Sequence, residues 1–144
     1  VERDQFRAGH LRADLAAVGT DAAGLTPLPA TSAFIERCRA WASRPGEAWR
    51  LLGVWYVLEG ATNGGRFIAR NVRRGAGLAG PDGTRYLDPY GEAQPQRWEA
   101  FKQSLDAVVP EREWPKVRAA ACETYDAVTA IGDQLAALFP APAR

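Results

Sequence analysis

The chain has 144 residues, a net charge of +1 and a hydrophobic share of 47%, which together suit one globular domain spanning residues 1–144. The near balance of basic and acidic residues argues against a nucleic-acid-binding protein. The chain contains neither a long apolar run nor a charged-then-apolar leader, so we expect no membrane contact, no signal peptide and a cytoplasmic location.

The first half of the chain predicts two helices. Residues 4–18 form the first, because their apolar side chains make a stripe wide enough to pack on a core. Gly19 supplies its C-terminal stop, and a proline-containing loop follows over 20–30. The second helix is expected to start near Ser32, which can act as its N-cap, and to end at 43–46. The stripe of the first helix consists of Phe6, His10, Leu11, Ala13, Leu15, Ala17 and Val18.

The second half predicts three more helices. Residues 47–74 read as one helix whose first part is apolar all round, which places it centrally in the fold. An irregular loop over 75–93 follows, and a loop of this length is often functional or mobile. Gln94 and Pro95 open the next helix. The last helix, 115–139, carries a bundle seam with alternating spacings of four and three residues, so the pattern predicts an all-α multihelical bundle. The seam consists of Val117, Ala121, Thr124, Val128, Ile131, Leu135 and Leu138.

Three glycines, Gly60, Gly64 and Gly65, lie inside the predicted 47–74 helix. Each glycine in a helix interior costs about 1 kcal/mol relative to alanine, so a structural reason for them is expected. One interpretation is a bend, or the close approach of a flat or bulky group to the bare backbone. The other is close contact between helices.

The segment Tyr-Val-Leu-Glu-Gly-Ala-Thr-Asn-Gly-Gly-Arg-Phe-Ile-Ala-Arg (56–70) resembles the distal helix of bacterial heme oxygenases. These are the biliverdin-forming enzymes often found beside bacterial phytochromes. Residues 11–19 and 25–29 resemble the family's middle helix and the turn after it, and 86–91 resembles the segment after the distal helix. The resemblance implies a heme-oxygenase-like bundle that cleaves heme oxidatively to biliverdin, carbon monoxide and iron. Heme would be substrate and cofactor, and a ferredoxin- or flavodoxin-type protein would donate electrons.

The resemblance also implies site residues. The backbone of the three glycines would form a platform over the heme face. Asn63 departs from the apolar residue usual in the family, so its amide could bond a ligand or mark a pocket no longer used for heme. Apart from the resemblance, Tyr56 could donate a hydrogen bond into a pocket or serve the core. Arg66 and Arg70 belong to a basic stripe that also includes Arg73 and Arg74 on one helix face. Such arginines can bind the two heme propionates or dock an acidic electron donor, whereas the alternative is a solvated helix face. Tyr86 and Tyr90 are further hydrogen-bond donors that a pocket or the core could use.

His10 is the one histidine of the chain, and so the one imidazole available to heme iron. In the register that fits best it lies in the middle-helix segment and is not the family's proximal ligand, whereas a second register would align it with that ligand. Asp14, one turn later, could orient its ring. The alternative is an inert, hydrogen-bonded histidine. The family's proximal-histidine helix has no counterpart here, so we expect an N-terminally truncated member.

Two functions therefore stay open. One is heme degradation, and the other is a non-catalytic heme-oxygenase-like protein that binds a tetrapyrrole or acts as a dimeric interaction module. Truncation should uncover apolar surface on the central helix and on the C-terminal seam, which predicts a homodimer. Cys38 and Cys122 lack any zinc-site spacing, so we expect two free, buried thiols.

Overall fold

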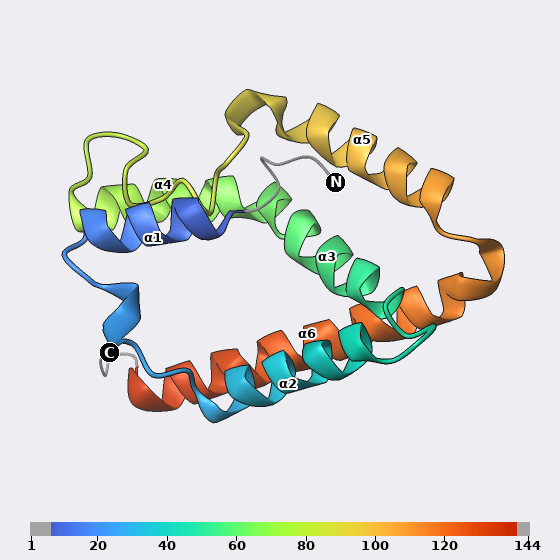
Figure 1. Ribbon diagram of the computed structural model, residues 1–144. Helices are drawn as coiled ribbons and strands as arrows, with labels where there is room; N and C mark the ends of the chain where they lie inside the picture. The colour runs from blue at the N-terminus through green and yellow to red at the C-terminus, as the bar shows by residue number, and fades with distance from the viewer. Residues whose placement is uncertain (1–6, 141–144) are drawn as a thin grey trace. The chain divides into compact units, whose positions relative to one another are not determined.

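The computed structural model describes residues 7–140, and in this part of the chain the only regular elements are helices (Figure 1). The all-α prediction is therefore confirmed. Across residues 7–140, no helix is both long enough and apolar enough to cross a membrane. The α-helices are α1 (Ala8–Ala17), α2 (Pro29–Ser43), α3 (Arg50–Gly60), α4 (Thr62–Ala76), α5 (Gln94–Val108) and α6 (Trp114–Leu138). Single 3-10 turns are η2 (Ala22–Gly24), η3 (Gly91–Ala93) and η4 (Glu111–Glu113).

The described chain divides into two compact units, and the boundaries between them fall after Leu25, inside α3 and inside α5. The first unit contains residues 7–25 and 58–104, and the second contains residues 26–57 and 105–140. All three glycines of the candidate site belong to the first unit. The exposed half of α6 belongs to the second unit.

The core of the second unit forms where α2 and α6 lie side by side and α3 meets α6 (Figure 1). Trp41, Val54 and Ala120 are its buried centre. Gly53 lets the two backbones of α3 and α6 approach closely, because a Cβ there would lie under 3.0 Å from the carbonyl oxygen of Val117. A glycine within the apolar run of residues 51–58 was the available sequence signal for this crossing.

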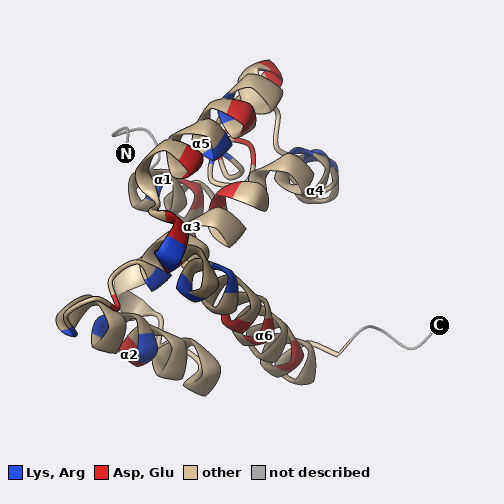
Figure 2. Cartoon of the chain, turned by 90° about the vertical axis from the view of Figure 1, so that its right-hand side faces the viewer, with Lys and Arg blue, Asp and Glu red and all other residues tan. Residues whose placement is uncertain are grey.

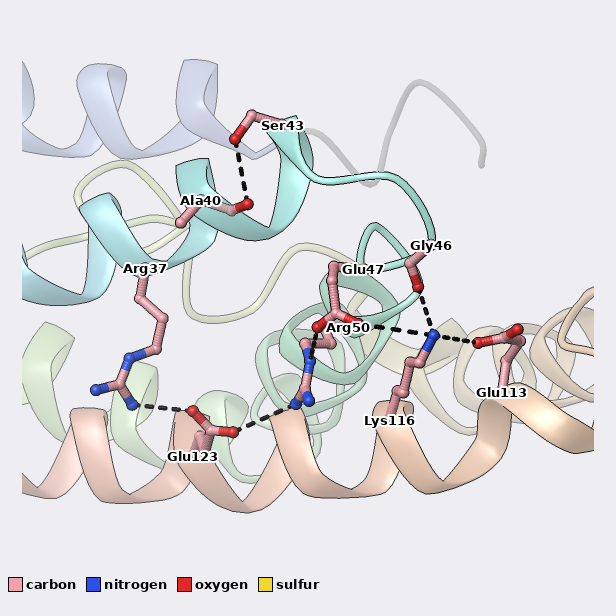
Figure 3. Close-up of polar contacts among 9 residues, drawn as sticks. All are labelled: Arg37, Ala40, Ser43, Gly46, Glu47, Arg50, Glu113, Lys116 and Glu123. Carbon is pink, nitrogen blue, oxygen red and sulfur yellow. Dashed lines mark hydrogen bonds and ion pairs between the residues drawn. The ribbon is translucent and has the colours of Figure 1, made fainter.

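A chain of ion pairs ties the α2–α3 turn of this unit to α6 (Figure 3). Glu123 accepts from Arg37 at 3.0 Å and from Arg50 at 3.4 Å. Arg50 also binds Glu47 at 2.6 Å, and Lys116 donates to the carbonyl of Gly46 at 2.7 Å. The bond from Arg50 lowers the pKa of Glu47 below its ordinary value.

The start of α2 differs from the prediction. The helix begins at Pro29, with Leu28 as its N-cap residue, and the N–H of Ser32 already donates to the Leu28 carbonyl at 2.9 Å. Proline suits the first helical position because it needs no N–H partner there. The N–H of Ala30 donates to Gln134 Oε1 of α6 at 3.0 Å, so a tertiary contact replaces the expected serine cap.

The predicted apolar stripe of the first helix does not face a core. Leu11 of α1 is 42% exposed and Val18, the residue after the helix, is 50% exposed, whereas the buried residue of α1 is Asp14. Residues 4–6 of that predicted helix lie outside the described part. Cys122 is also exposed, contrary to the expected burial, while Cys38 is half-buried against the core.

The seam of α6 is buried in its first half only. Val117 and Thr124 are buried, whereas Val128, Leu135 and Leu138 are 47%, 44% and 60% exposed. Apolar side chains in the second half of the seam are therefore exposed. On the central helix, Leu58 is 39% exposed.

Candidate functional site

The glycine-rich segment is bent. The helix predicted over 47–74 is in fact two helices, because α3 ends at Gly60 and α4 begins at Thr62. Ala61 keeps helical angles (φ −61°, ψ −24°), so the break is a bend and not a loop. The hydroxyl of Thr62 donates to the carbonyl of Glu59 at 2.6 Å, and the amide of Asn63 donates to the carbonyl of Gly60 at 3.0 Å. These side chains satisfy main-chain acceptors at the helix end.

A buried polar cluster surrounds the bend. Gln94 of α5, which is 2% exposed, donates through Nε2 to the Thr62 hydroxyl at 2.6 Å and to Asn63 Oδ1 at 3.4 Å. Both ends of the Asn63 amide are therefore bonded within the protein. The bend is held from α5 as well as by its own side chains.

Glu59 is fully buried beside the bend, and its sole ion pair in residues 7–140 is with Arg7 at 3.6 Å. Neither carboxylate oxygen has a hydrogen-bond partner in the same part of the chain. Arg7 donates instead to the Leu58 carbonyl at 2.9 Å, and its guanidinium lies 5.3 Å from the centre of the Tyr86 ring. A single acidic residue closing an apolar helical run was the sequence signal for this contact.

The three glycines have different surroundings. A Cβ on Gly60 would lie 3.3 Å from the Trp98 ring, and one on Gly65 would lie under 3.0 Å from the Leu87 carbonyl oxygen. A Cβ on Gly64 would meet no atom within 4 Å. Two of the glycines therefore accommodate the chain's own segments, and Gly64 alone of the three leaves bare helix backbone open.

The loop that covers Gly65 is firmly anchored. Asp14 accepts main-chain N–H groups from Arg85 at 2.9 Å and Tyr86 at 2.7 Å. Arg73 donates to the buried Thr84 hydroxyl at 3.2 Å and forms an ion pair with Asp88 at 3.8 Å. The irregular 75–93 segment, whose first two residues belong to α4, is thus held by polar contacts from both α1 and α4.

His10 is half-buried on α1, and its Nδ1 is a buried atom without a hydrogen-bond partner in the described chain. Both Asp14 oxygens accept main-chain N–H groups of the loop, and His10 Nδ1 has no hydrogen-bond partner in the described chain, so Asp14 does not orient the ring through that nitrogen. Residues 7–140 contain no group of three or more His, Cys, Asp or Glu side chains that could hold a metal ion.

The four arginines do not act as one stripe. Arg73 turns toward the loop, as described above, and Arg74 bonds Asn71 at 3.2 Å. Arg66 and Arg70 are exposed and lie over the Phe67 ring, with guanidinium carbons 4.8 and 5.9 Å from its centre. Figure 2 shows the positive residues gathered on α4. Their exposure fits both the anion-binding and the solvated-face interpretation of the sequence.

The tyrosines lie in different settings. Tyr56 belongs to the part of α3 in the second unit and is 37% exposed. Tyr86 carries the Arg7 contact, and Tyr90 lies under Arg97 with a guanidinium-to-ring distance of 5.7 Å. Tyr86 and Tyr90 therefore take part in packing within the first unit.

The Gly64 surface fits a flat anionic ligand in two respects. Its bare backbone permits close approach, and arginine forks on the same helix suit carboxylates. The chain matches no protein-family model, no curated protein and no solved structure.

Proposed function

We propose that this chain is a heme-oxygenase-like domain that binds heme on the Gly64 face of α4. The observation that carries the proposal is the open backbone at Gly64, in the helix whose sequence resembles the heme-covering helix of that family. Arg66 and Arg70, one turn apart and both exposed, support it because they can pair with the two propionates.

Each residue would have a distinct part in binding. Gly64 lets the porphyrin plane approach the helix axis, and Thr62 and Asn63 hold the bend that presents this surface. The Phe67 ring keeps the two guanidinium groups together by cation–π contact. His10 is the proposed imidazole ligand, because it is the one histidine of the chain.

The proposed reaction is oxidative cleavage of heme to biliverdin, carbon monoxide and iron, with electrons from a ferredoxin- or flavodoxin-type donor. Heme itself supplies the oxygen-binding iron and is the molecule consumed. The protein's residues orient it and exclude bulky axial ligands through the bare backbone.

A hemin titration followed at the Soret band tests binding. We expect a saturable one-to-one shift that is weakened at least tenfold in Gly64→Leu, because the new side chain fills the open surface. Gly75→Leu is the matched control. A Cβ added at Gly75 would also meet no atom within 4 Å, and Gly75 lies about three turns further along the same side of α4. Equal affinities of the two variants would refute the Gly64 site. Loss of a histidine-type spectrum in His10→Ala would identify the ligand.

The non-catalytic alternative has one observation in its favour. Trp98 and the Leu87 carbonyl cover two of the three glycines, which leaves a smaller platform than the resemblance implies. Incubation of the hemin complex with a reductant and oxygen separates the two functions. Soret loss with release of biliverdin would support turnover, whereas an unchanged spectrum would favour a tetrapyrrole-binding module.

A further inference from the structure

Two exposed helix faces of this chain carry opposite charge. From residue 60 to 81, which includes α4, there is no Asp or Glu, and Arg70 and Arg74 are exposed. From residue 119 to 140, which includes most of α6, there is no Lys or Arg, and Asp126 and Asp133 are exposed. Figure 2 shows blue on α4 and red along α6 toward its C-terminal end. Each face can therefore attract the other when it comes from a second molecule.

The α4 face has three strips. Its charged edge is formed by Arg70 and Arg74, and its opposite edge by Ile68 and Val72, which are 54% and 38% exposed. Between the edges lies Gly64, where an added Cβ would meet nothing within 4 Å. The strips follow from helical spacing, because residues four apart share a side and residues three apart lie beside it.

The α6 face repeats this layout. Asp126 and Asp133 form its charged edge, and Val128 and Leu135, 47% and 44% exposed, form its apolar edge. Its central strip contains Gly132, where an added Cβ would also meet no atom within 4 Å. Small residues at both centres would let two such helices approach closely.

The order of the strips selects a direction. In a right-handed helix viewed from outside with its N-terminus upward, successive residues advance from right to left across the near face. On α4 the arginine edge is then on the right, whereas on α6 the acidic edge is on the left. When the two faces meet, parallel helices bring arginine against aspartate and aliphatic against aliphatic. Antiparallel helices would set each charged edge against an apolar one.

Aromatic side chains fit the same arrangement. Tyr125 is 58% exposed and lies in the central strip of α6, and Phe67 is 51% exposed beside the centre of α4. If Tyr125 of one chain lies opposite Gly64 of the other, then Gly132 lies opposite Asn71, because both residues are seven positions further along parallel helices. A large ring then faces a bare backbone, which is how well-packed interfaces interdigitate.

We propose that a second copy of this chain docks on α4 through the C-terminal half of its α6, with the two helices parallel. Made twice about a two-fold axis, this contact closes a homodimer. The inference does not depend on heme binding. Because both occupants use the Gly64 face, however, hemin and the second chain should compete.

Charge reversal tests the contact by sedimentation equilibrium. We expect the wild-type chain to be a dimer, and Arg70→Glu/Arg74→Glu and Asp126→Arg/Asp133→Arg each to be monomers. A one-to-one mixture of the two variants should dimerise again, because every α4–α6 contact in it pairs opposite charges or unaltered faces. Arg112→Glu is the control, since its side chain is 82% exposed on η4, and it should leave the dimer intact.

Three results would overturn the proposal. A wild-type monomer at the highest soluble concentration would remove the dimer. If the Arg70→Glu/Arg74→Glu variant still formed a dimer and the Asp126→Arg/Asp133→Arg variant did not, the contact would be between two α6 helices. A monomer whose urea midpoint falls in both variants would place the contact within one chain. Circular dichroism of each variant, expected to match the wild-type helix content, separates loss of contact from loss of folding.

Discussion

Gly64 and Gly65 are neighbours in one helix, yet alanine should have opposite effects at the two positions. At Gly64 the methyl group meets no atom within 4 Å, so the helix gains about 0.5–1 kcal/mol of stability from reduced backbone entropy in the unfolded chain. At Gly65 the same methyl would lie under 3.0 Å from the Leu87 carbonyl oxygen, a separation that real Cβ atoms essentially never show.

The Leu87 carbonyl cannot move away cheaply. Its segment is held by the two N–H bonds to Asp14 and by the bond from Arg73 to Thr84. Overpacking of this kind costs about 1–3 kcal/mol, of which the helix gain offsets up to about 1 kcal/mol. We therefore expect Gly65→Ala to lower the free energy of unfolding by about 1–2 kcal/mol.

Urea unfolding followed by circular dichroism measures both variants against the wild-type chain. Gly64→Ala should raise the urea midpoint and Gly65→Ala should lower it, with unchanged slopes. A Gly65→Ala protein at least as stable as Gly64→Ala would refute the inferred contact between α4 and the loop.

Three further predictions concern other contacts. Gly53→Ala should lower the free energy of unfolding by about 1–3 kcal/mol because its methyl meets the α6 backbone, and a urea midpoint equal to wild type would contradict this crossing. Asp14→Asn should cost about 1–3 kcal/mol, since an amide keeps one acceptor oxygen for two buried N–H groups; hydrogen exchange should show faster exchange at 84–88, and unchanged protection there would refute the anchor. The hydrogen bond from Arg50 holds the pKa of Glu47 below its ordinary 4.5, so the ionised form favours the folded state. The stabilisation that this ionised carboxylate gives the folded state is complete above pH 4.5 and is lost as the pH falls through the folded-state pKa. Glu47→Gln should therefore make the urea midpoint fall less steeply in acid. Identical pH profiles of the variant and the wild-type chain would exclude this contribution of Glu47.

Local sequence rules predicted the helices well where the helix has its own start signal or a regular apolar spacing. Gln94 and Pro95 open α5 as expected, and the four-three spacing of apolar residues predicted α6 almost to its ends. A bend was one of the interpretations of the glycines, and the structure places it at Ala61. These features depend on backbone propensity and periodicity, which act within a few residues of each other.

The cap of α2 could not be found in the same way. Its first N–H group, that of Ala30, donates to Gln134, more than a hundred residues away, and Ser32, which was expected to cap the helix, is an interior residue. The apolar stripe of α1 likewise indicated burial, whereas the structure buries Asp14 there to hold a distant loop. Both errors come from long-range polar contacts that leave no periodic pattern.

The sequence by itself determined that the chain is all helical, that α4 carries arginine without acid, and that glycines interrupt an otherwise helical run. Tertiary structure alone decided which of those glycines is open. Gly64 and Gly65 are the same residue type in adjacent positions. The helical rotation between them points the Cα–H of Gly64 into open space and sets that of Gly65 against Leu87. A glycine's use depends on the atoms that approach it, and these come from segments whose positions follow from the packing of the whole unit.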